Sequence, residues 1–416
     1  MRPEGIRRAQ IEAEISEVRR LWSRGERATA VAGAEDLYRR FPGKHAVAQL
    51  LAYYLYTTRN LDRALAVAHD CFERFPNPQV LLLLCRILTR AGRDAEILKL
   101  TNGCSSNPRL LPYALLCRGG ALLKISGEFD SAVELFHRAA EAGDLENDQA
   151  PAGAALRLDE FDLLATGNLA ANSLRFLSAP PPERIETVVM AAADERYFRA
   201  LHELYMGTFF ACHPGANHVL HFHLYDPSES LLEEVADLAG ARQGRLQFSW
   251  EMTDRTNRSY YYVGRFIQMP LLMLRYNAPI VATDIDCGFR AGIDPILEAV
   301  RDADLGMVEV ERHIVPWRNL LANLVVFNCT ETARMYAMAI RNFLLRLPND
   351  VNYWYVDQLA LVQCDYLARS AHAGKVVRVS QEWRQVVRQG TGKTGMPEAK
   401  AGRVANALAR SSRPPQ

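Results

Sequence analysis

The residues best suited to do chemistry are two aspartates that follow a short apolar segment. Residues 278–282 predict an apolar β-strand, and Asp284 and Asp286 follow at its end, separated by one residue. On an extended backbone, residues i and i+2 point to the same side, so we expect both carboxylates to face one point. Oxygen donors of this kind suit Mg²⁺ or Mn²⁺, which keeps water ligands and binds substrate phosphates. The pair predicts a metal site that holds a diphosphate; the alternative is a turn with two solvated aspartates.

The elements that must position this pair alternate between strands and helices after residue 183. The sequence predicts strands at 186–192, 219–225, 246–250 and 278–282, and helices at 197–212, 230–239 and 264–275. Such alternation predicts a mostly parallel central sheet covered by helices on both faces. Ligands then bind at the carboxyl ends of the strands. Asp194 and the Asp284/Asp286 pair both fall there.

The first 145 residues have a different period. Phe41-Pro42 recurs as Phe75-Pro76, 34 residues later, and the segment 60–64 returns as 128–132. Two helices in a unit of about 34 residues are typical of tetratricopeptide repeats. Residues 25–143 resemble degenerate repeats of that family. Such arrays form a concave surface that binds partner chains; the alternative is an array that only braces the rest of the chain or dimerises.

The stretch between these parts predicts a boundary. Residues 146–151 are polar and turn-forming, 154–177 predict helix, and Pro180 to Pro182 stop any helix. The expected fold class is α + α/β. We expect a repeat solenoid at 1–145, a helical linker at 146–183, an α/β domain at 184–395 and a disordered tail at 396–416.

Three motifs of the α/β part have a family counterpart. They are the segment Asp194–Tyr197 behind the first strand, the helix 260–272 that contains Arg265, and the segment 283–287. With them, residues 185–395 resemble a GT-A-type nucleotide-sugar glycosyltransferase, closest to the family-eight, glycogenin-like group. The resemblance implies a GT-A-like fold, a divalent cation and a nucleotide-diphosphate sugar as donor.

The resemblance also implies roles for single residues. Tyr197 would stack on the nucleotide base and Asp194 would contact the uracil or ribose; the alternative for Asp194 is an ordinary helix N-cap. Arg265 would bind the donor diphosphate with its guanidinium fork, and the alternative is a solvated arginine on an amphipathic helix. Asp286 would ligate the metal directly, and Asp284 would divide its role between metal and ribose.

Two later segments extend the resemblance. The strand from Asn323 to Asn328 resembles the sugar-contact strand, although Val325 stands where the family has a glycine; the alternative is a strand-edge asparagine that caps a turn. Asp357 matches an aspartate near the acceptor, where it would orient a hydroxyl or, in an inverting enzyme, act as base. The alternative is a helix-start residue favoured by the macrodipole.

Compared with the family, the chain has a candidate lysine for the diphosphate but no clear third metal ligand. Residues 388–395 resemble a flexible glycine-lysine loop that closes over the diphosphate, with Lys393 as its cation. The late histidine that often supplies a third metal ligand is not clearly present, since His372 comes too early. The alternative to an active enzyme is therefore a repeat scaffold or adaptor with a catalytically inactive glycosyltransferase-like domain.

Composition excludes several other classes. The formal net charge is +1, which gives no case for nucleic acid, and no apolar run is long enough to predict a transmembrane segment. None of the eight cysteines forms a Cys-x-x-Cys pair, so neither a zinc site nor a thioredoxin-type motif is indicated. Most of them lie in apolar segments, where cysteine acts as a small buried hydrophobe, and this favours a reducing, cytoplasmic setting. His221 and His223 share one face of a predicted strand, and we expect them to be buried histidines rather than metal ligands.

The resemblance thus implies a metal-dependent hexosyltransferase that takes a sugar from a nucleotide-diphosphate donor, with UDP-sugar favoured. The expected partners are the nucleotide sugar and a protein acceptor or partner enzyme recruited by the repeats. The sequence leaves homo-oligomerisation open.

Overall fold

The computed structural model describes residues 3–167, 174–177, 181–215, 217–242, 244–255, 258–310, 312–348, 353–370, 374–389 and 401–405. The chain divides into two compact units. The helical unit comprises Met1–Gly153 with Glu311–Val315, and the sheet unit comprises Ala154–Val310 with Pro316–Gln416. The division thus falls a few residues after the expected 145/146, and one short segment from late in the chain belongs with the helices.

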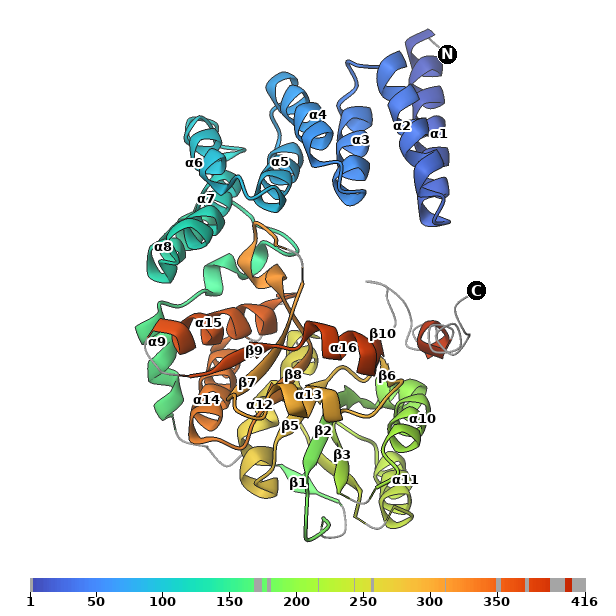
Figure 1. The fold of residues 1–416 in the computed structure, drawn as a ribbon, viewed down its shortest axis with the longest axis vertical. Coiled ribbons are helices and arrows are strands. Elements are labelled where there is room, and N and C mark those ends of the chain that lie inside the picture. Colours follow the sequence, from blue (N-terminus) through green and yellow to red (C-terminus); the bar gives the residue numbers. More distant parts are fainter. Residues whose placement is uncertain are drawn as a thin grey trace. The chain divides into compact units, whose positions relative to one another are not determined.

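The helical unit is a row of eight described helices in which each packs against the next (Figure 1). Their bounds are α1 Pro3–Ser23, α2 Arg27–Arg40, α3 His45–Thr57, α4 Leu61–Arg74, α5 Pro78–Arg90, α6 Asp94–Asn102, α7 Leu111–Ser126 and α8 Phe129–Ala142. The even-numbered helices begin at residues 27, 61, 94 and 129, which are 34, 33 and 35 residues apart. The period seen in the sequence is therefore a period of helix pairs, and the assignment of these pairs to the tetratricopeptide family stays a prediction.

The repeated Phe-Pro pairs mark helix ends. Helices α2 and α4 stop at Arg40 and Arg74, and the C-caps Phe41 and Phe75 have φ of −133° and −137°. A residue before proline is pushed out of the helical region by the proline ring. The same dipeptide thus ends the second helix of two successive pairs.

Small residues let α7 approach its neighbours closely. A Cβ on Gly119 would lie 2.6 Å from the Phe136 ring of α8, and a Cβ on Gly120 would lie 1.9 Å from the Ile314 carbonyl oxygen. The backbone of the segment 312–315 therefore lies directly on α7, where only glycine fits. This contact explains why the segment groups with the helices.

The stretch that follows the helices contradicts one expectation. Residues 154–177 are not one helix: they contain the end of η1 Ala150–Ala154, α9 Leu158–Leu163, η2 Leu164–Thr166 and strand β1 Arg175–Phe176. Strand β1 pairs antiparallel with β4 Leu246–Glu251 and forms the edge of the sheet, and Leu177 N–H donates to the Phe248 carbonyl at 3.1 Å. Hydrogen bonds to a sheet edge outweigh local helix propensity here.

The sheet unit is built on an eight-stranded sheet in the order β1-β4-β3-β2-β5-β8-β7-β9. Its remaining strands are β2 Thr187–Asp194, β3 His218–Tyr225, β5 Ile280–Thr283, β7 Leu305–Glu309, β8 Leu320–Phe327 and β9 Val376–Arg378. Strands β2 to β5 are mutually parallel, as expected for a mostly parallel sheet, whereas β8 runs antiparallel to both β5 and β7. A second, two-stranded sheet joins β6 Cys287–Phe289 to β10 Val387–Gln389.

Helices cover both faces of the large sheet (Figure 1). Helices α10 Glu195–Cys212 and α11 Glu229–Gly240 pack on alternate strand residues such as Val189, Phe222 and Phe248. Helices α12 Arg258–Tyr276, α14 Glu331–Arg346 and α15 Val356–Ser370 lie on the opposite face, while α13 Asp294–Ala299, η3 Pro316–Asn319 and α16 Ser380–Val386 complete the unit. Strands β2, β3, β4 and β5 are buried along nearly their whole length, as expected for a sheet enclosed on both sides.

Three findings bear on the location and the tail. Among the described residues, no helix combines the length and apolar character needed to cross a membrane. All eight cysteines are free thiols, and six of them are buried.

Within the tail that was expected to be disordered, residues 401–405 are helical with Val404 buried, and the rest of 396–416 lies outside the described residues.

The face of β3 and β4 beneath α12 is polar, unlike the apolar face beneath α10. His221 is fully buried and hydrogen-bonds the Tyr276 hydroxyl at 2.7 Å and the Ser249 hydroxyl at 2.8 Å. His223 Nδ1 lies 2.9 Å from the same Ser249 oxygen. Within the described residues, no three metal-ligating side chains gather here or elsewhere. These histidines have protein partners, which makes them structural.

We predict that acid destabilises the sheet unit through this layer. Burial, and after it the neighbouring His223, lowers the pKa of His221 well below its ordinary value. In mild acid the His221 imidazole is therefore protonated in the unfolded chain but not in the folded chain. The stability contributed is complete above about pH 6.5 and is lost as the pH falls toward the folded-state pKa. Thermal midpoints measured from about pH 7.5 to 5 should fall, and His221→Gln should make the fall shallower. An equally steep fall in the variant would contradict this assignment.

Candidate active site

Four parallel strands end in a carboxylate at the same edge of the sheet. Asp194 ends β2, Asp226 follows β3, Glu251 ends β4 and Asp284 follows β5. Because parallel strands have their carboxyl ends on one edge, these side chains gather where α/β proteins bind ligands. Their surroundings differ, and the differences decide what each can do.

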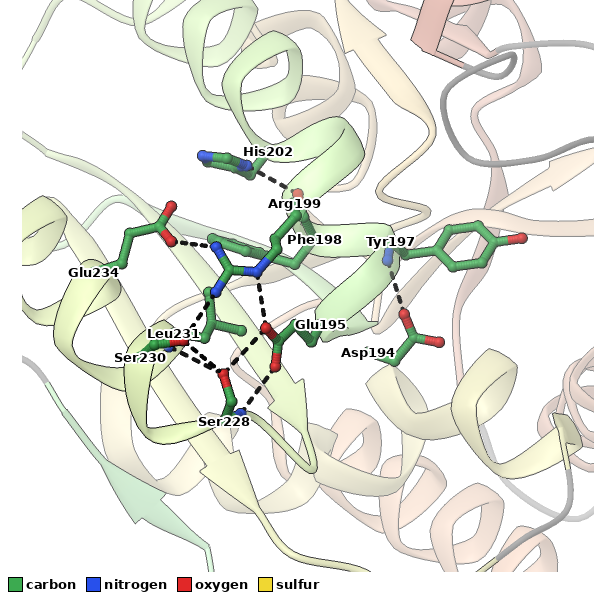
Figure 2. A network of polar contacts seen from close by, with 10 residues as sticks. All are labelled: Asp194, Glu195, Tyr197, Phe198, Arg199, His202, Ser228, Ser230, Leu231 and Glu234. Carbon is green, nitrogen blue, oxygen red and sulfur yellow. Dashed lines mark hydrogen bonds and ion pairs between the residues drawn. The ribbon is translucent and has the colours of Figure 1, made fainter.

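Asp194 is the N-cap of α10. Its Oδ1 accepts a hydrogen bond from Tyr197 N–H at 2.8 Å, which is the alternative foreseen for this residue. In Figure 2 the Tyr197 ring points away from the ion pairs of α10, while Asp194 lies below the first turn of the helix. The cap engages only one of the two carboxylate oxygens. A nucleotide role for Asp194 stays a prediction.

An exposed network fixes the start of α10. Arg199 bonds Glu195 at 2.8 Å and Glu234 of α11 at 2.5 Å, and Ser228 N–H donates to Glu195 at 2.9 Å (Figure 2). The Arg199 hydrogen bond, and then that from Ser228 N–H, lower the pKa of Glu195. By joining α10 to the N-terminus of α11, the network sets the direction of the turn that carries Asp194 and Tyr197.

Arg265 of α12 is the centre of the site. Only 6% of the residue is exposed, so it is not the solvated arginine of the alternative reading. Its Nη2 lies 3.0 Å from Asp284 Oδ1 and 3.3 Å from Asp357 Oδ2, and it donates to the Ala322 carbonyl at 2.9 Å. One guanidinium thus draws together residues from α12, the end of β5, β8 and α15. Charge-assisted bonds of this kind are the strong ones in proteins.

Antiparallel pairing of β5 and β8 brings Asn323 to this point. Thr283 pairs with Leu324, and Asp284 N–H donates to the Asn323 carbonyl at 3.4 Å. Val325, at the position of the family's glycine, is a fully buried strand residue paired with Ala282 and Met307. Asn323 therefore joins the site although the glycine is absent.

Asn328 does not join the site, contrary to expectation. Since β8 is antiparallel to β5, Phe327 pairs with Ile280 and Asn328 follows at the opposite edge of the sheet. Its amide donates to the carbonyls of Val300 and Ala303 at 3.2 and 2.9 Å. The residue holds the loop between α13 and β7.

The strand argument for the aspartate pair is wrong in its geometry. Strand β5 ends at Thr283, and Cys287 N–H donates to the Asp284 carbonyl at 3.2 Å, which closes a turn. The chain must reverse here because β6 pairs with β10 rather than extending β5. A turn, not an extended backbone, relates Asp284 to Asp286. The Asp284 side chain is 28% exposed, and Asp286 is 8% exposed.

The two carboxylates remain donors of the kind that a partly hydrated divalent cation prefers, and a metal role for them stays a prediction. Mg²⁺ and similar ions are held by one or two carboxylates plus substrate phosphates, so a cage of three protein ligands is not required. A carboxylate has two oxygens, and Asp284 can therefore accept from Arg265 at Oδ1 and still serve a cation. His372 and Lys393 lie outside the described residues; Gln389, four residues before Lys393, pairs with Cys287 beside Asp286.

Asp357 is the second residue of α15, as the helix-start alternative predicted. Its Oδ1 accepts from Gln358 N–H at 2.8 Å while its Oδ2 faces Arg265. Burial raises the pKa of Asp357 against the opposing pull of Arg265 and the backbone amides. A carboxylate with a raised pKa beside a fixed cation is suited to accept a proton or orient a hydroxyl.

Sequence reasoning assigned no role to Gln358, Asp226 or Glu251. Gln358 Oε1 is buried and has no hydrogen-bond partner among the described residues, directly beside Asp357. Asp226 accepts from Thr253 N–H at 2.7 Å and from the Tyr261 hydroxyl at 3.0 Å. The signal for Asp226 and Glu251 was present: each is an acidic residue directly after a predicted strand.

Comparison with known proteins places these residues in context. No family model and no curated protein sequence matches the chain. Among solved structures it is similar to the galactosyltransferase LgtC in complex with donor and acceptor sugar analogues, at 15% identity and a TM-score of 0.37, over 55% of this chain and 98% of that chain. It is also similar to the bifunctional glycosyltransferase WbbM, at 13% identity and a TM-score of 0.34, over 67% of this chain and 63% of that one. Mouse xyloside xylosyltransferase 1 follows at 11% identity and a TM-score of 0.31, over 47% and 84%. These solved neighbours are glycosyltransferases, and the likenesses are remote.

We predict opposite effects of alanine at two helical glycines. A Cβ on Gly264 would lie 1.3 Å from the buried Tyr225 hydroxyl oxygen, whereas a Cβ on Gly207 of α10 meets nothing within 4 Å. Gly264→Ala should therefore lower the thermal midpoint of the sheet unit by several degrees. Gly207→Ala should leave it unchanged or raise it, since alanine favours a helix interior by about 1 kcal/mol. Equal midpoints for the two variants would show that α12 does not pack on Tyr225 as described.

Proposed function

We propose that this protein is a metal-dependent glycosyltransferase that moves a sugar from a nucleotide-diphosphate donor, with UDP favoured, to an acceptor. The observation that carries the proposal is the convergence of Asp284, Asp357 and the Asn323 strand on the buried Arg265 at the carboxyl edge of the sheet. Fixed opposite charges at a ligand-binding edge are what a reaction with a departing diphosphate requires.

Asp284 and Asp286 would hold the cation in this proposal. A bound Mg²⁺ or Mn²⁺ supplies positive charge that stabilises a departing diphosphate. Arg265 would bind the same diphosphate, because its planar fork has five donors and can keep Asp357 while it accepts a new anion. Lys393 would add a second protein cation.

The remaining candidates divide between nucleoside and sugar. Tyr197 would stack on the base and Asp194 would contact the ribose, from the first turn of α10. Asn323, which lies beside Asp284 through the β5–β8 pairing, would contact the donor sugar. Asp357 would orient a reacting hydroxyl, and its raised pKa supports the role of a proton acceptor.

The helical unit would recruit a protein acceptor or a partner enzyme. A cavity of about 640 Å³ in this unit is lined by four aromatic rings together with amide and guanidinium groups, namely Trp22, Tyr53, Tyr54, Tyr113, Gln49, Gln79, Arg19 and Arg86 among others. Tyr53 is 45% exposed there. Aromatic and arginine side chains are enriched at protein interfaces. The competing proposal, a scaffold with an inactive transferase-like domain, shares this surface and differs only at the sheet unit.

Nucleotide binding is the first prediction that separates the two proposals. UDP with Mn²⁺ should raise the thermal midpoint of the protein. A ligand that binds only the folded state stabilises it by about 2.7 kcal/mol when its free concentration is about 100 times its Kd. Asp286→Asn should abolish the shift by removing a metal ligand. Asp302→Asn is the control, since it removes an exposed aspartate of the sheet unit outside the proposed site. A flat response of the unmodified protein to UDP, with and without Mn²⁺, would remove the main support for the transferase.

Turnover tests the role of Arg265. Release of UDP from a UDP-sugar in the presence of Mn²⁺ should fall about 100-fold or more in Arg265→Lys, since loss of one fixed donor to a developing anion has an effect of this size. Lysine retains the charge but lacks the planar fork, whose Nη2 contacts both Asp284 and Asp357. Unchanged turnover would exclude Arg265 from the diphosphate site. Nucleotide binding without any turnover would favour the inactive scaffold.

A further inference from the structure

A buried carboxylate of the sheet contacts the helix that carries Arg265 at two points. Glu251, at the end of β4, is only 3% exposed. Its Oε1 accepts from the Tyr260 hydroxyl at 2.7 Å and its Oε2 accepts from Gln268 Nε2 at 3.2 Å. Both donors belong to α12, so one carboxylate spans two turns of that helix.

The spacing of these contacts fixes the rotation of α12 about its axis. Tyr260, Gly264 and Gln268 are four residues apart and therefore share one face of the helix. That face lies on the ends of β3 and β4, since a Cβ on Gly264 would overlap the Tyr225 hydroxyl. Arg265 is one residue further on, which turns its side chain by about 100° from this face. From there it reaches Asp284 and the Ala322 carbonyl.

A second buried charge, on α14, also contacts this helix. Arg341 of α14 is 1% exposed and donates to the Ile267 carbonyl. Pro270 has no N–H, so this part of α12 lacks one helical hydrogen bond. The Arg341 side chain adds a donor next to that gap. Glu251 thus contacts α12 at Tyr260, before Arg265, and at Gln268, after it, while Arg341 contacts the helix at Ile267.

Glu251 is charged in this setting. Burial raises the pKa of Glu251, but the nearby His223, the Tyr260 hydroxyl and the charge of Arg341 together outweigh burial and bring the pKa below its usual value. His223 Nε2 lies 3.6 Å from Glu251 Oε1. Isolated buried charges are costly, and such groups are retained in some proteins because they specify one arrangement. Here the arrangement specified is the position of α12.

We propose that Glu251 is a positioning residue for Arg265. Its carboxylate sets the rotation and height of α12, and so places the Arg265 guanidinium against Asp284 and Asp357. Glu251 itself has no contact with those carboxylates in the described structure and acts through the helix. The effect on donor binding rests on the proposed function, whereas the placement of Arg265 can be tested without any ligand.

The ligand-free test is a double-mutant cycle on thermal stability with Glu251→Gln, Arg265→Met and the double variant. Glu251→Gln keeps the shape but removes the charge, so α12 shifts and Arg265 loses its partners. We expect Arg265→Met to lower the midpoint clearly less in the Glu251→Gln background than in the unmodified protein. Additive shifts would overturn the proposal. Should Glu251→Gln fail to fold, Tyr260→Phe removes one of the two helix contacts and replaces it in the cycle.

The matched control is another buried carboxylate of the sheet unit. Asp365 is 5% exposed and pairs with Arg369 at 2.7 Å and Arg378 at 2.8 Å, on the later turns of α15. Asp365→Asn should lower the midpoint too, but its effect should add to that of Arg265→Met. Equal non-additivity for Asp365 and Glu251 would mean that general loosening, not positioning, couples the residues, and would overturn the proposal.

The ligand test uses UDP with Mn²⁺ as the probe and titration calorimetry as the readout. Glu251→Gln should weaken binding about tenfold or more, Asp365→Asn should leave it unchanged, and Glu251→Gln should weaken it no further once Arg265 is methionine. Unchanged binding in Glu251→Gln would overturn the proposal. No binding to the unmodified protein would instead count against the proposed function, and the ligand-free cycle would then decide the placement of Arg265.

Discussion

The sheet unit depends on the bridge from Arg265 to Asp284 and Asp357. A guanidinium cannot lose its proton in a protein, so once it is buried it must have acceptors. The two carboxylates lie 73 residues apart in the chain, one after β5 and the other at the start of α15. The bridge therefore forms only when α12, the β5–β8 pair and α15 are all in place. Removal of one member of such a buried group typically costs 3–5 kcal/mol because the others keep uncompensated charge.

This dependence also prepares the site for an anion. Without a ligand, the two carboxylates neutralise Arg265 and hold its side chain in one position. A diphosphate that enters offers oxygen acceptors of the same kind, so it can share the guanidinium without a new charge having to be buried alone. Once Arg265 is shared with a ligand, the Asp357 carboxylate, whose pKa is raised by burial, is held more by its remaining hydrogen bond from Gln358 N–H. The same contacts that stabilise the fold thus orient the groups proposed to react.

The sequence predicted strands β2 to β5 and helices α10 to α12 to within a few residues, apart from the start of α12. Strands enclosed on both faces leave continuous apolar runs and amphipathic helices leave a helical period, so these elements were predictable. The turn after Thr283, strand β1 and the displacement of Asn328 were not predictable in this way. Each is decided by pairing with a distant strand, namely β10, β4 and the antiparallel β5. Local patterns contain no information on such partners.

The four strand-end carboxylates show why position alone does not give a role. Parallel topology places Asp194, Asp226, Glu251 and Asp284 at one edge. Asp194 caps a helix, Asp226 accepts from the Thr253 N–H after β4, Glu251 anchors α12 and Asp284 contacts a guanidinium. Only Asp284 combines a cationic partner with a partly exposed side chain, which leaves it able to respond to a ligand. Asp226 and Glu251 accept from backbone, hydroxyl and amide donors and fix the shape of this edge of the sheet, while the cap at Asp194 engages one of its two carboxylate oxygens. A carboxylate is a candidate for chemistry here when its neighbours leave it partly exposed and able to accept further bonds. Those neighbours are determined by the fold rather than by the adjacent residues in the sequence.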